Sequence, residues 1–214
     1  MNKRAMYILS GLVLASTVLS GFNAVKVMEV EKRVAEIKPV QQAQESASFS
    51  FPTGTPQVYG EELDVKYEDV SSENPEKAEK TIQKFASYDS IEISGAKKDR
   101  YTDILYRMDG GISCEYCCEA ESVITVEGKP GCGCSHAVAM RGLTKYLLKN
   151  HGNEMSDREI FQEVAKWKTR YFPKQTRAKV KGLREQGAEV SLANLASNRY
   201  RGVSSHEGGW VGDC

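Results

Sequence analysis

The sequence predicts a mainly α-helical protein with a small β-hairpin, preceded by a transmembrane helix. Three observations support this expectation. Residues 5–25 are mostly apolar and uncharged, amphipathic helical patterns with recognisable caps follow residue 61, and one short β-branched stretch lies between glycine-rich turns. We expect a compact domain of four to five helices in which the hairpin forms a cysteine-rich, metal-type knuckle.

The N-terminal segment is predicted to anchor the chain in a membrane. Residues 1–4 contain Lys3 and Arg4 and are expected on the cytoplasmic side, because basic residues tend to remain inside. Residues 5–28 are apolar enough, and long enough, to span the hydrocarbon core as one helix. The bulk of the chain would then be extracytoplasmic in a single-pass protein. A cleaved signal peptide is the alternative.

The remainder of the chain divides into three parts. Residues 29–60 are expected to form a stalk and a linker, since Pro39 ends the first helical pattern and Gln, Ala, Ser and Pro dominate the residues after it. Residues 61–187 are expected to form the helical cysteine-cluster domain. Residues 188–214, rich in Gly, Ser and Asn, are expected to be a flexible C-terminal tail that ends in Cys214.

Helix starts within the domain are indicated by local capping patterns. Asn74 before Pro75 is a typical helix start, and Ser156 with Glu159 forms a capping box. Helices are expected at 76–87, 97–108, 136–150, from the Ser156 cap to Tyr171, and at 174–186, with short strands at 90–94 and 122–127.

Charge and histidine content limit the possible functions. Lys plus Arg equals Asp plus Glu at 29 each, so no global charge favours a nucleic-acid partner. The chain has 3 histidines, which argues against a histidine-rich catalytic metal site. Between Lys166 and Arg184 all charged residues are basic. This pattern predicts a solvated helix face, with contact to anionic lipid headgroups as the alternative.

The cysteines are the main functional signal, because most of them fall in one short segment. They form a C-x-x-C-C…C-x-C-x-H pattern made of Cys114, Cys117, Cys118, Cys132, Cys134 and His136. The intervening hairpin would bring the two cysteine pairs together, as in four-cysteine zinc sites. The surplus of soft ligands, with Met140 as a weaker thioether, also suits Cu(I). We expect Cys114, Cys117, Cys132 and Cys134 to bind Zn or Cu, with Cys118 and His136 as supplementary ligands.

Two alternatives to a metal site remain open. The C-x-x-C spacing is typical of thiol–disulfide exchange, with Cys114, Cys117, Cys132 and Cys134 as redox candidates and Cys134, just before a helix, as the best nucleophile. Structural disulfides are common outside the cytoplasm. We expect a binding protein rather than an enzyme, and any enzyme activity would be that of a thiol–disulfide oxidoreductase. Expected partners are the membrane, through the N-terminal helix, and a metal-donor or thiol partner protein.

The amino-acid sequence of the cysteine segment resembles that of a family of uncharacterised, membrane-anchored archaeal proteins. The resemblance is carried by the SCEYCC run at 113–118, the CGCSH run at 132–136, the AMRGL run at 139–143 and the KWK run at 166–168. A weaker similarity is to the membrane-anchored thiol reductant of cytochrome c maturation. It rests on Cys114 and Cys117, on Met140-Arg141 and on the SDREI run at 156–160. This second resemblance implies a redox role for the C-x-x-C pair, whereas Cys118, Cys132 and Cys134 have no counterpart in that family.

Overall fold

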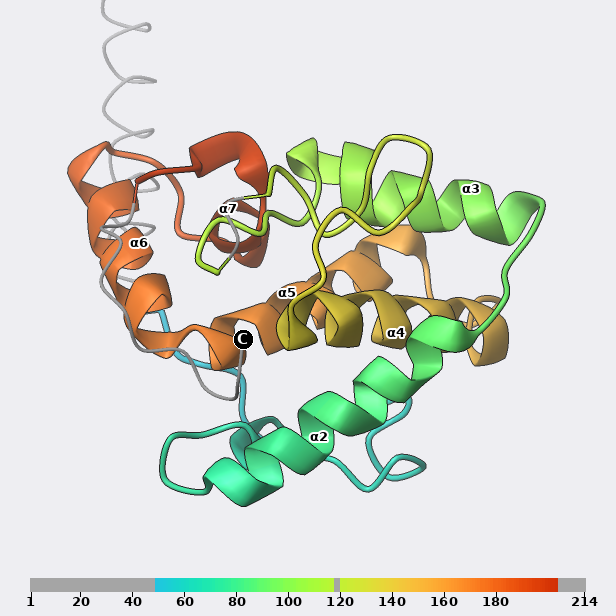
Figure 1. Cartoon of the computed structure of the whole chain (residues 1–214). Helices are drawn as coiled ribbons and strands as arrows, with labels where there is room; N and C mark the ends of the chain where they lie inside the picture. Colours follow the sequence, from blue (N-terminus) through green and yellow to red (C-terminus); the bar gives the residue numbers. More distant parts are fainter. Residues whose placement is uncertain (1–48, 118–119, 204–214) are drawn as a thin grey trace, which may run out of the picture. The chain divides into compact units, whose positions relative to one another are not determined.

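The computed structural model describes residues 49–117 and 120–203 (Figure 1). The predicted anchor at 5–28, the stalk up to residue 48, Cys118 and residues 204–214 lie outside the described residues. Within the described ranges, no helix has the length and apolar character that a membrane span requires.

The described part of the chain is mainly helical, as predicted. The helices are α2 (Pro75–Ser87), α3 (Ala96–Thr102), α4 (Ser135–Asn150), α5 (Asp157–Tyr171), α6 (Pro173–Glu185) and α7 (Leu192–Ala196). Short 3₁₀ turns lie at Tyr67–Asp69, Tyr88–Ser90, Met108–Gly110 and Asn198–Tyr200. Pairing outside the helices consists of isolated bridges, so these residues contain no β-sheet.

The two predicted helix caps are confirmed. The Asn74 side chain accepts a hydrogen bond from the Lys77 amide at 3.1 Å, and proline occupies the first turn of α2. At the start of α5, the Ser156 hydroxyl accepts from the Glu159 amide, while the Glu159 carboxylate accepts from the Ser156 amide at 2.7 Å. These bonds satisfy N–H groups that have no partner inside the helix.

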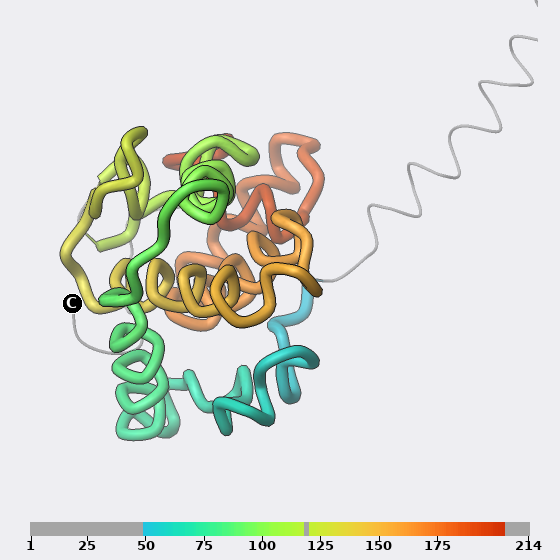
Figure 2. The backbone as a smooth tube through the Cα atoms, turned by 90° about the vertical axis from the view of Figure 1, so that its right-hand side faces the viewer, coloured from blue at the N-terminus to red at the C-terminus, as the bar shows by residue number. Residues whose placement is uncertain are grey.

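Helix α4 lies at the centre of the domain. Helix α2 packs on one side of it, and helix α3 and the cysteine-containing loop at 111–134 lie on the other (Figures 1 and 2). The close contact with α2 depends on Gly142, because a Cβ at this position would lie 2.0 Å from the Phe85 carbonyl oxygen. Helix α5 also packs against α4, and its fully buried Trp167 contacts the Phe85 ring with centroids 4.9 Å apart.

The predicted strand at 90–94 is wrong. Tyr88–Ser90 forms a 3₁₀ turn, and residues 91–94 form no backbone ladder. Ile91 and Ile93 instead pack against the core as irregular backbone. The helix predicted at 97–108 is present, but it consists of α3, which ends at Thr102, and a π-helical turn that continues it over Asp103–Arg107.

Ordered structure extends beyond the two boundaries expected at residues 61 and 187. Tyr59, in the expected linker, is fully buried; its hydroxyl donates to Glu163 at 2.9 Å and accepts from the Trp167 indole at 2.6 Å. Helix α7, in the expected tail, buries Leu195 and Ala196. Both segments are polar in overall composition, and a few buried apolar side chains anchor them to the domain.

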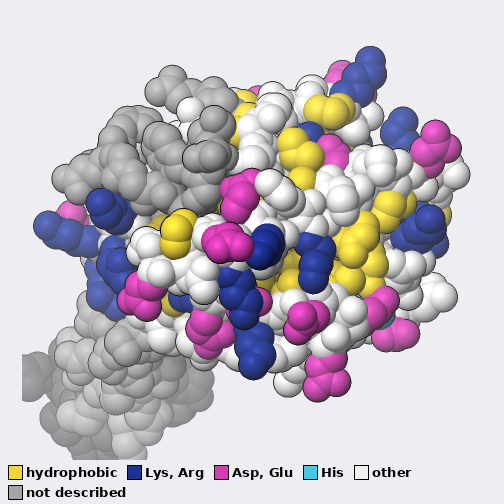
Figure 3. Space-filling model, turned by 60° about the horizontal axis from the view of Figure 1, so that its bottom comes forward, with side chains coloured by type: hydrophobic (Ala, Val, Ile, Leu, Met, Phe, Trp, Pro, Cys, Tyr) yellow, Lys and Arg dark blue, Asp and Glu magenta, His cyan; other side chains and the backbone are white. Residues whose placement is uncertain are grey.

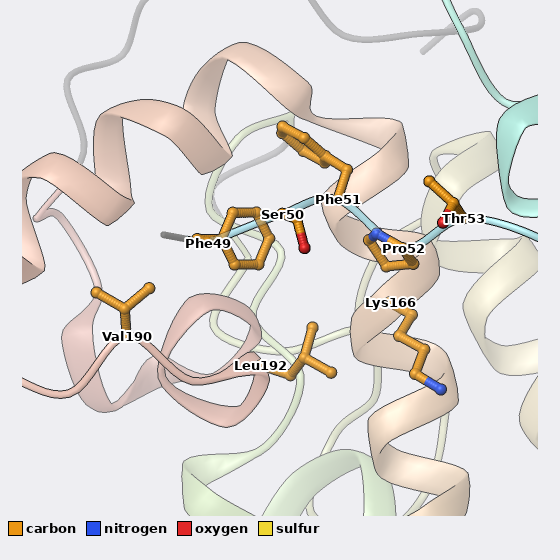
Figure 4. A pocket seen from close by; sticks show the side chains of 8 residues that line it. All are labelled: Phe49, Ser50, Phe51, Pro52, Thr53, Lys166, Val190 and Leu192. Carbon is orange, nitrogen blue, oxygen red and sulfur yellow. The ribbon is translucent and has the colours of Figure 1, made fainter. Parts of the chain in front are cut away.

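A pocket lies beside the start of the described chain, and no cysteine lines it (Figure 4). Its lining consists of the extended segment 49–53, Lys166 of α5, Val190 and Leu192. The rings of Phe49 and Phe51 meet edge to face there, with centroids 5.3 Å apart.

The basic run between Lys166 and Arg184 is only partly the solvated face that its composition predicts. Lys168 and Lys179 are buried, at 2% and 0% exposure, whereas Lys181 remains exposed. On the face seen in Figure 3, acidic and basic side chains are interspersed with small apolar areas. Lys168 and Lys179 therefore do not belong to the solvent-exposed charged surface.

Candidate metal centre

The cysteine segment is an irregular loop that joins the turn at Met108–Gly110 to α4. Ile124 and Pro130 form an isolated antiparallel bridge, and the Thr125 amide donates to the Lys129 carbonyl at 2.8 Å. The loop turns back closely at Gly131, where a Cβ would lie 2.5 Å from the Ser122 carbonyl oxygen. This turn, formed without a regular strand, returns Cys132 and Cys134 towards Cys114.

Three cysteines meet at the N-terminus of α4. The Sγ atoms of Cys114, Cys132 and Cys134 all lie within 4.8 Å of one another. Cys114 and Cys132 are buried, at 4% and 7% exposure, and Cys134 is half-buried. The predicted convergence of the two ends of the segment is therefore observed for these three residues. Such a group is compatible with metal binding.

The cysteines differ in oxidation state. Cys114 and Cys134 carry thiols, whereas Cys117 and Cys132 are in the disulfide form. Cys117 is half-buried and packs against the core, outside the three-cysteine group. A metal ion bound by Cys132 therefore requires that this cysteine first be reduced, because only a thiolate is a metal ligand.

Cys134 has an acidic thiol. Its side chain caps α4 by accepting a hydrogen bond from the Ala137 amide at 3.4 Å. A hydrogen bond from the Cys114 thiol lowers the pKa of Cys134 to about 4, assisted by His136 and the Ala137 amide and opposed by burial. The position before a helix, recognised in the sequence, accounts for part of this effect, since the helix N-terminus favours an anion.

His136 lies inside the protein rather than at its surface. Its ring is fully buried, with centroids 5.2 Å from the Tyr171 ring and 4.8 Å from the Phe172 ring. The hydrogen bond to Cys134 places its side chain next to the three-cysteine group. It can therefore orient Cys134 through this hydrogen bond.

Arg141 fixes the loop that contains Cys132. Its guanidinium donates to the Cys132 carbonyl at 2.6 Å and to the Val123 carbonyl at 3.2 Å. The same group binds the Asp89 carboxylate, with Nη2 to Oδ2 at 2.8 Å. One side chain of α4 thus ties the loop to the turn that follows α2.

Sequence reasoning missed the buried charged residues next to the cysteines, which are Glu115, Arg141, Lys168 and Lys179. One signal was present for Lys168, which lies four residues after Val164 and three before Tyr171, on the apolar stripe of α5. Glu115 had no such signal, because irregular loops have no periodicity from which burial can be predicted.

No family model, curated protein or solved structure matches the chain. The site itself is therefore the basis for a function, and its chemistry is that of clustered sulfur ligands beside a helix N-terminus.

Proposed function

We propose that the protein binds a soft metal ion, Zn(II) or Cu(I), through the thiolates of Cys114, Cys132 and Cys134. The observation that carries this proposal is the mutual approach of their three sulfur atoms within 4.8 Å. Zn–S bonds of about 2.3 Å in tetrahedral geometry separate ligand sulfurs by roughly 3.8 Å. Small side-chain rotations are enough to reach that separation.

The fourth position has several candidates from the same segment. His136 is next to Cys134, and Cys117 and Cys118 belong to the same pattern. Three thiolates alone also suit Cu(I), which favours soft sulfur ligands and low coordination numbers. The choice between the two metals depends on the charges around the site.

Metal titration of the reduced, full-length protein tests this proposal. Under anaerobic conditions with a non-thiol reductant, we expect one Zn(II) or Cu(I) per chain in competition with a chromogenic chelator. Cys132→Ser or Cys134→Ser should weaken binding by at least about 100-fold, because a ligand is lost. Met140→Leu, a volume-conserving change on α4, is the matched control if the thioether is not a ligand. Binding that survives both cysteine substitutions would refute the proposal.

Thiol–disulfide exchange is a second candidate, favoured by the low pKa of Cys134 beside the Cys114 thiol. The Cys134 thiolate would attack one sulfur of a partner disulfide, form a mixed disulfide and release the other sulfur as a thiolate. Cys114, after loss of its proton, would then attack Cys134, form an internal disulfide and release the second partner thiol. The two electrons pass to the partner.

This redox candidate makes a separate prediction. In glutathione buffers, the Cys114 and Cys134 thiols should equilibrate reversibly with an internal disulfide, as counted by intact mass spectrometry. Cys114→Ser should instead accumulate the mixed disulfide with glutathione. A protein whose Cys134 never forms a glutathione adduct is not an exchange protein.

We further propose that residues 5–28 hold this domain on the extracytoplasmic side of a membrane. The support is the uncharged, mostly apolar stretch at residues 5–25, which follows Lys3 and Arg4. Alkaline carbonate extraction of membranes that contain the full-length chain should leave it in the pellet. Release into the supernatant would contradict the anchor.

A further inference from the structure

A buried ionic cluster joins the cysteine segment to α5 and α6. It consists of Glu115, Lys168 and Lys179, whose exposed fractions are 3%, 2% and 0%. The Lys179 ammonium lies 2.7 Å from Glu115 Oε1, and the Lys168 ammonium lies 3.9 Å from the same oxygen. Two cations from α5 and α6 therefore share one carboxylate from the loop.

The remaining polar contacts of this cluster are neutral. Lys168 donates to the Ser113 hydroxyl at 2.5 Å and to the Ala196 carbonyl at 2.8 Å. Lys179 also approaches the Ser197 carbonyl at 3.4 Å, and Glu115 Oε2 accepts from the Gly202 amide at 3.0 Å. These described contacts provide one carboxylate for two ammonium groups. The cluster therefore has a surplus of one positive charge.

An uncompensated buried charge is costly, so a nearby anion is expected. Lys168 is adjacent to the three-cysteine group, because it binds Ser113 and its ammonium interacts electrostatically with Cys114. The pKa of Lys168 is lowered to about 7, mainly by burial; Lys179 and Arg201 contribute to this shift, while Glu115 and Cys114 oppose it. The anionic groups that would stabilise the Lys168 cation are therefore Glu115 and the cysteine group.

We propose that Lys168 and Lys179 provide the counter-charge for an anionic metal–thiolate centre and thereby favour Cu(I) over Zn(II). This inference rests on the metal-binding function proposed above. Three thiolates carry three negative charges, so the centre has a net charge of −1 with Zn(II) and −2 with Cu(I). Both metals bind to the same metal-free site, and the Cu(I) centre is more negative than the Zn(II) centre by one charge. Coulomb energy scales with the product of the charges, so a fixed positive group favours Cu(I) binding over Zn(II) binding.

The charge argument predicts that the ratio of Cu(I) to Zn(II) affinity changes in opposite directions in two variants. Lys168→Met removes one positive charge, and we expect this ratio to fall about tenfold. Glu115→Gln removes one negative charge and should raise the ratio by a similar factor. A loss of packing alone would weaken both metals together and leave the ratio unchanged. Lys179→Met is a second charge-removing variant on a different helix, should Lys168→Met not fold.

The experiment is a chelator competition that measures the dissociation constants of Zn(II) and Cu(I) for the reduced, full-length protein. Lys166→Met is the matched control, because Lys166 is on α5 but pairs with Glu163 at 2.6 Å, away from the cysteines. It should leave both constants within about threefold of the wild type. Circular dichroism verifies that each variant is folded.

The possible outcomes separate the two proposals. Opposite changes of the Cu(I)-to-Zn(II) affinity ratio in Lys168→Met and Glu115→Gln support the counter-charge role. The same ratio in Lys168→Met and Lys166→Met, or a lower ratio in Glu115→Gln, overturns it while the metal site stands. A wild-type protein that binds neither metal overturns the proposed function and this inference together.

Discussion

Replacement of Arg141 by methionine tests whether one buried guanidinium holds the cysteine loop in place. Its side chain is 4% exposed and binds two backbone carbonyls and the Asp89 carboxylate. Methionine fills a similar volume but donates no hydrogen bond. The variant therefore leaves the buried carbonyls of Val123 and Cys132 without their cationic donor.

The magnitude of this effect can be worked out from these contacts. Loss of one partner of a buried ion pair costs about 3–5 kcal/mol. Asp89 keeps Lys145 at 2.9 Å, so its carboxylate stays paired and part of this cost is avoided. The Val123 carbonyl keeps the Gly131 amide as a donor at 3.1 Å, so the carbonyl that loses its described donor is that of Cys132, at a cost of about 1–3 kcal/mol. We expect Arg141→Met to lower the free energy of unfolding by about 3 kcal/mol. Arg141→Lys should lose less, about 1–2 kcal/mol, because it keeps the charge but not the forked geometry.

Urea unfolding, followed by the helical circular dichroism signal, measures this change. The control is Arg107→Met, which removes an exposed pair with Asp103 whose side chains are 56% and 49% exposed. Such a pair contributes less than about 0.5 kcal/mol. If Arg141→Met lowers stability by no more than Arg107→Met, then the guanidinium does not hold the loop and this reasoning is wrong.

Three further predictions concern the core and the reactive thiol. Gly142→Ala should destabilise the fold by at least about 2 kcal/mol in the same urea assay, because its Cβ would lie 2.0 Å from the Phe85 carbonyl oxygen; an unchanged midpoint would contradict the close helix contact. Tyr59→Phe should cost about 1–3 kcal/mol, because the Trp167 indole would lose its acceptor at 2.6 Å; a neutral result would mean that another group accepts this bond. The rate at which iodoacetamide modifies Cys134 should stay nearly constant as the pH falls from about 8, and it should decline only near the Cys134 pKa of about 4. The rate for an ordinary thiol, with a pKa of 9.0, falls throughout that range. Because the folded-state pKa of Cys134 is lowered, the thiolate's contribution to stability is complete above pH 9.0 and is lost as the pH falls towards about 4.

The helical parts of the fold could be predicted because their signals are local. The caps at Asn74 and Ser156 involve residues within one turn, and the structure has both. The strand at 90–94 could not be judged in the same way, because alternation predicts a strand only where another strand pairs with it. Here Ile91 and Ile93 bury their side chains from irregular backbone.

The candidate site was partly predictable, for similar reasons. Spacing around a glycine turn was enough to predict that Cys114 would meet Cys132 and Cys134. The position of Lys168 on the apolar stripe of α5 indicated its burial, whereas no local signal indicated that Lys179 is buried, because its burial depends on Glu115 in a distant loop. The sequence also could not indicate that the segment after residue 187 packs against the cysteine loop, where Ile112 and Ser197 form a bridge.

The most direct test of the metal-binding proposal is the sulfur coordination of the bound metal. X-ray absorption spectroscopy on the reduced, full-length protein, loaded with one equivalent of Zn(II) or Cu(I), counts the sulfur neighbours. We predict at least three sulfur atoms at about 2.3 Å from the metal, and one fewer in the Cys132→Ser variant. A metal surrounded only by nitrogen and oxygen, or an unchanged sulfur count in that variant, would contradict the proposed centre.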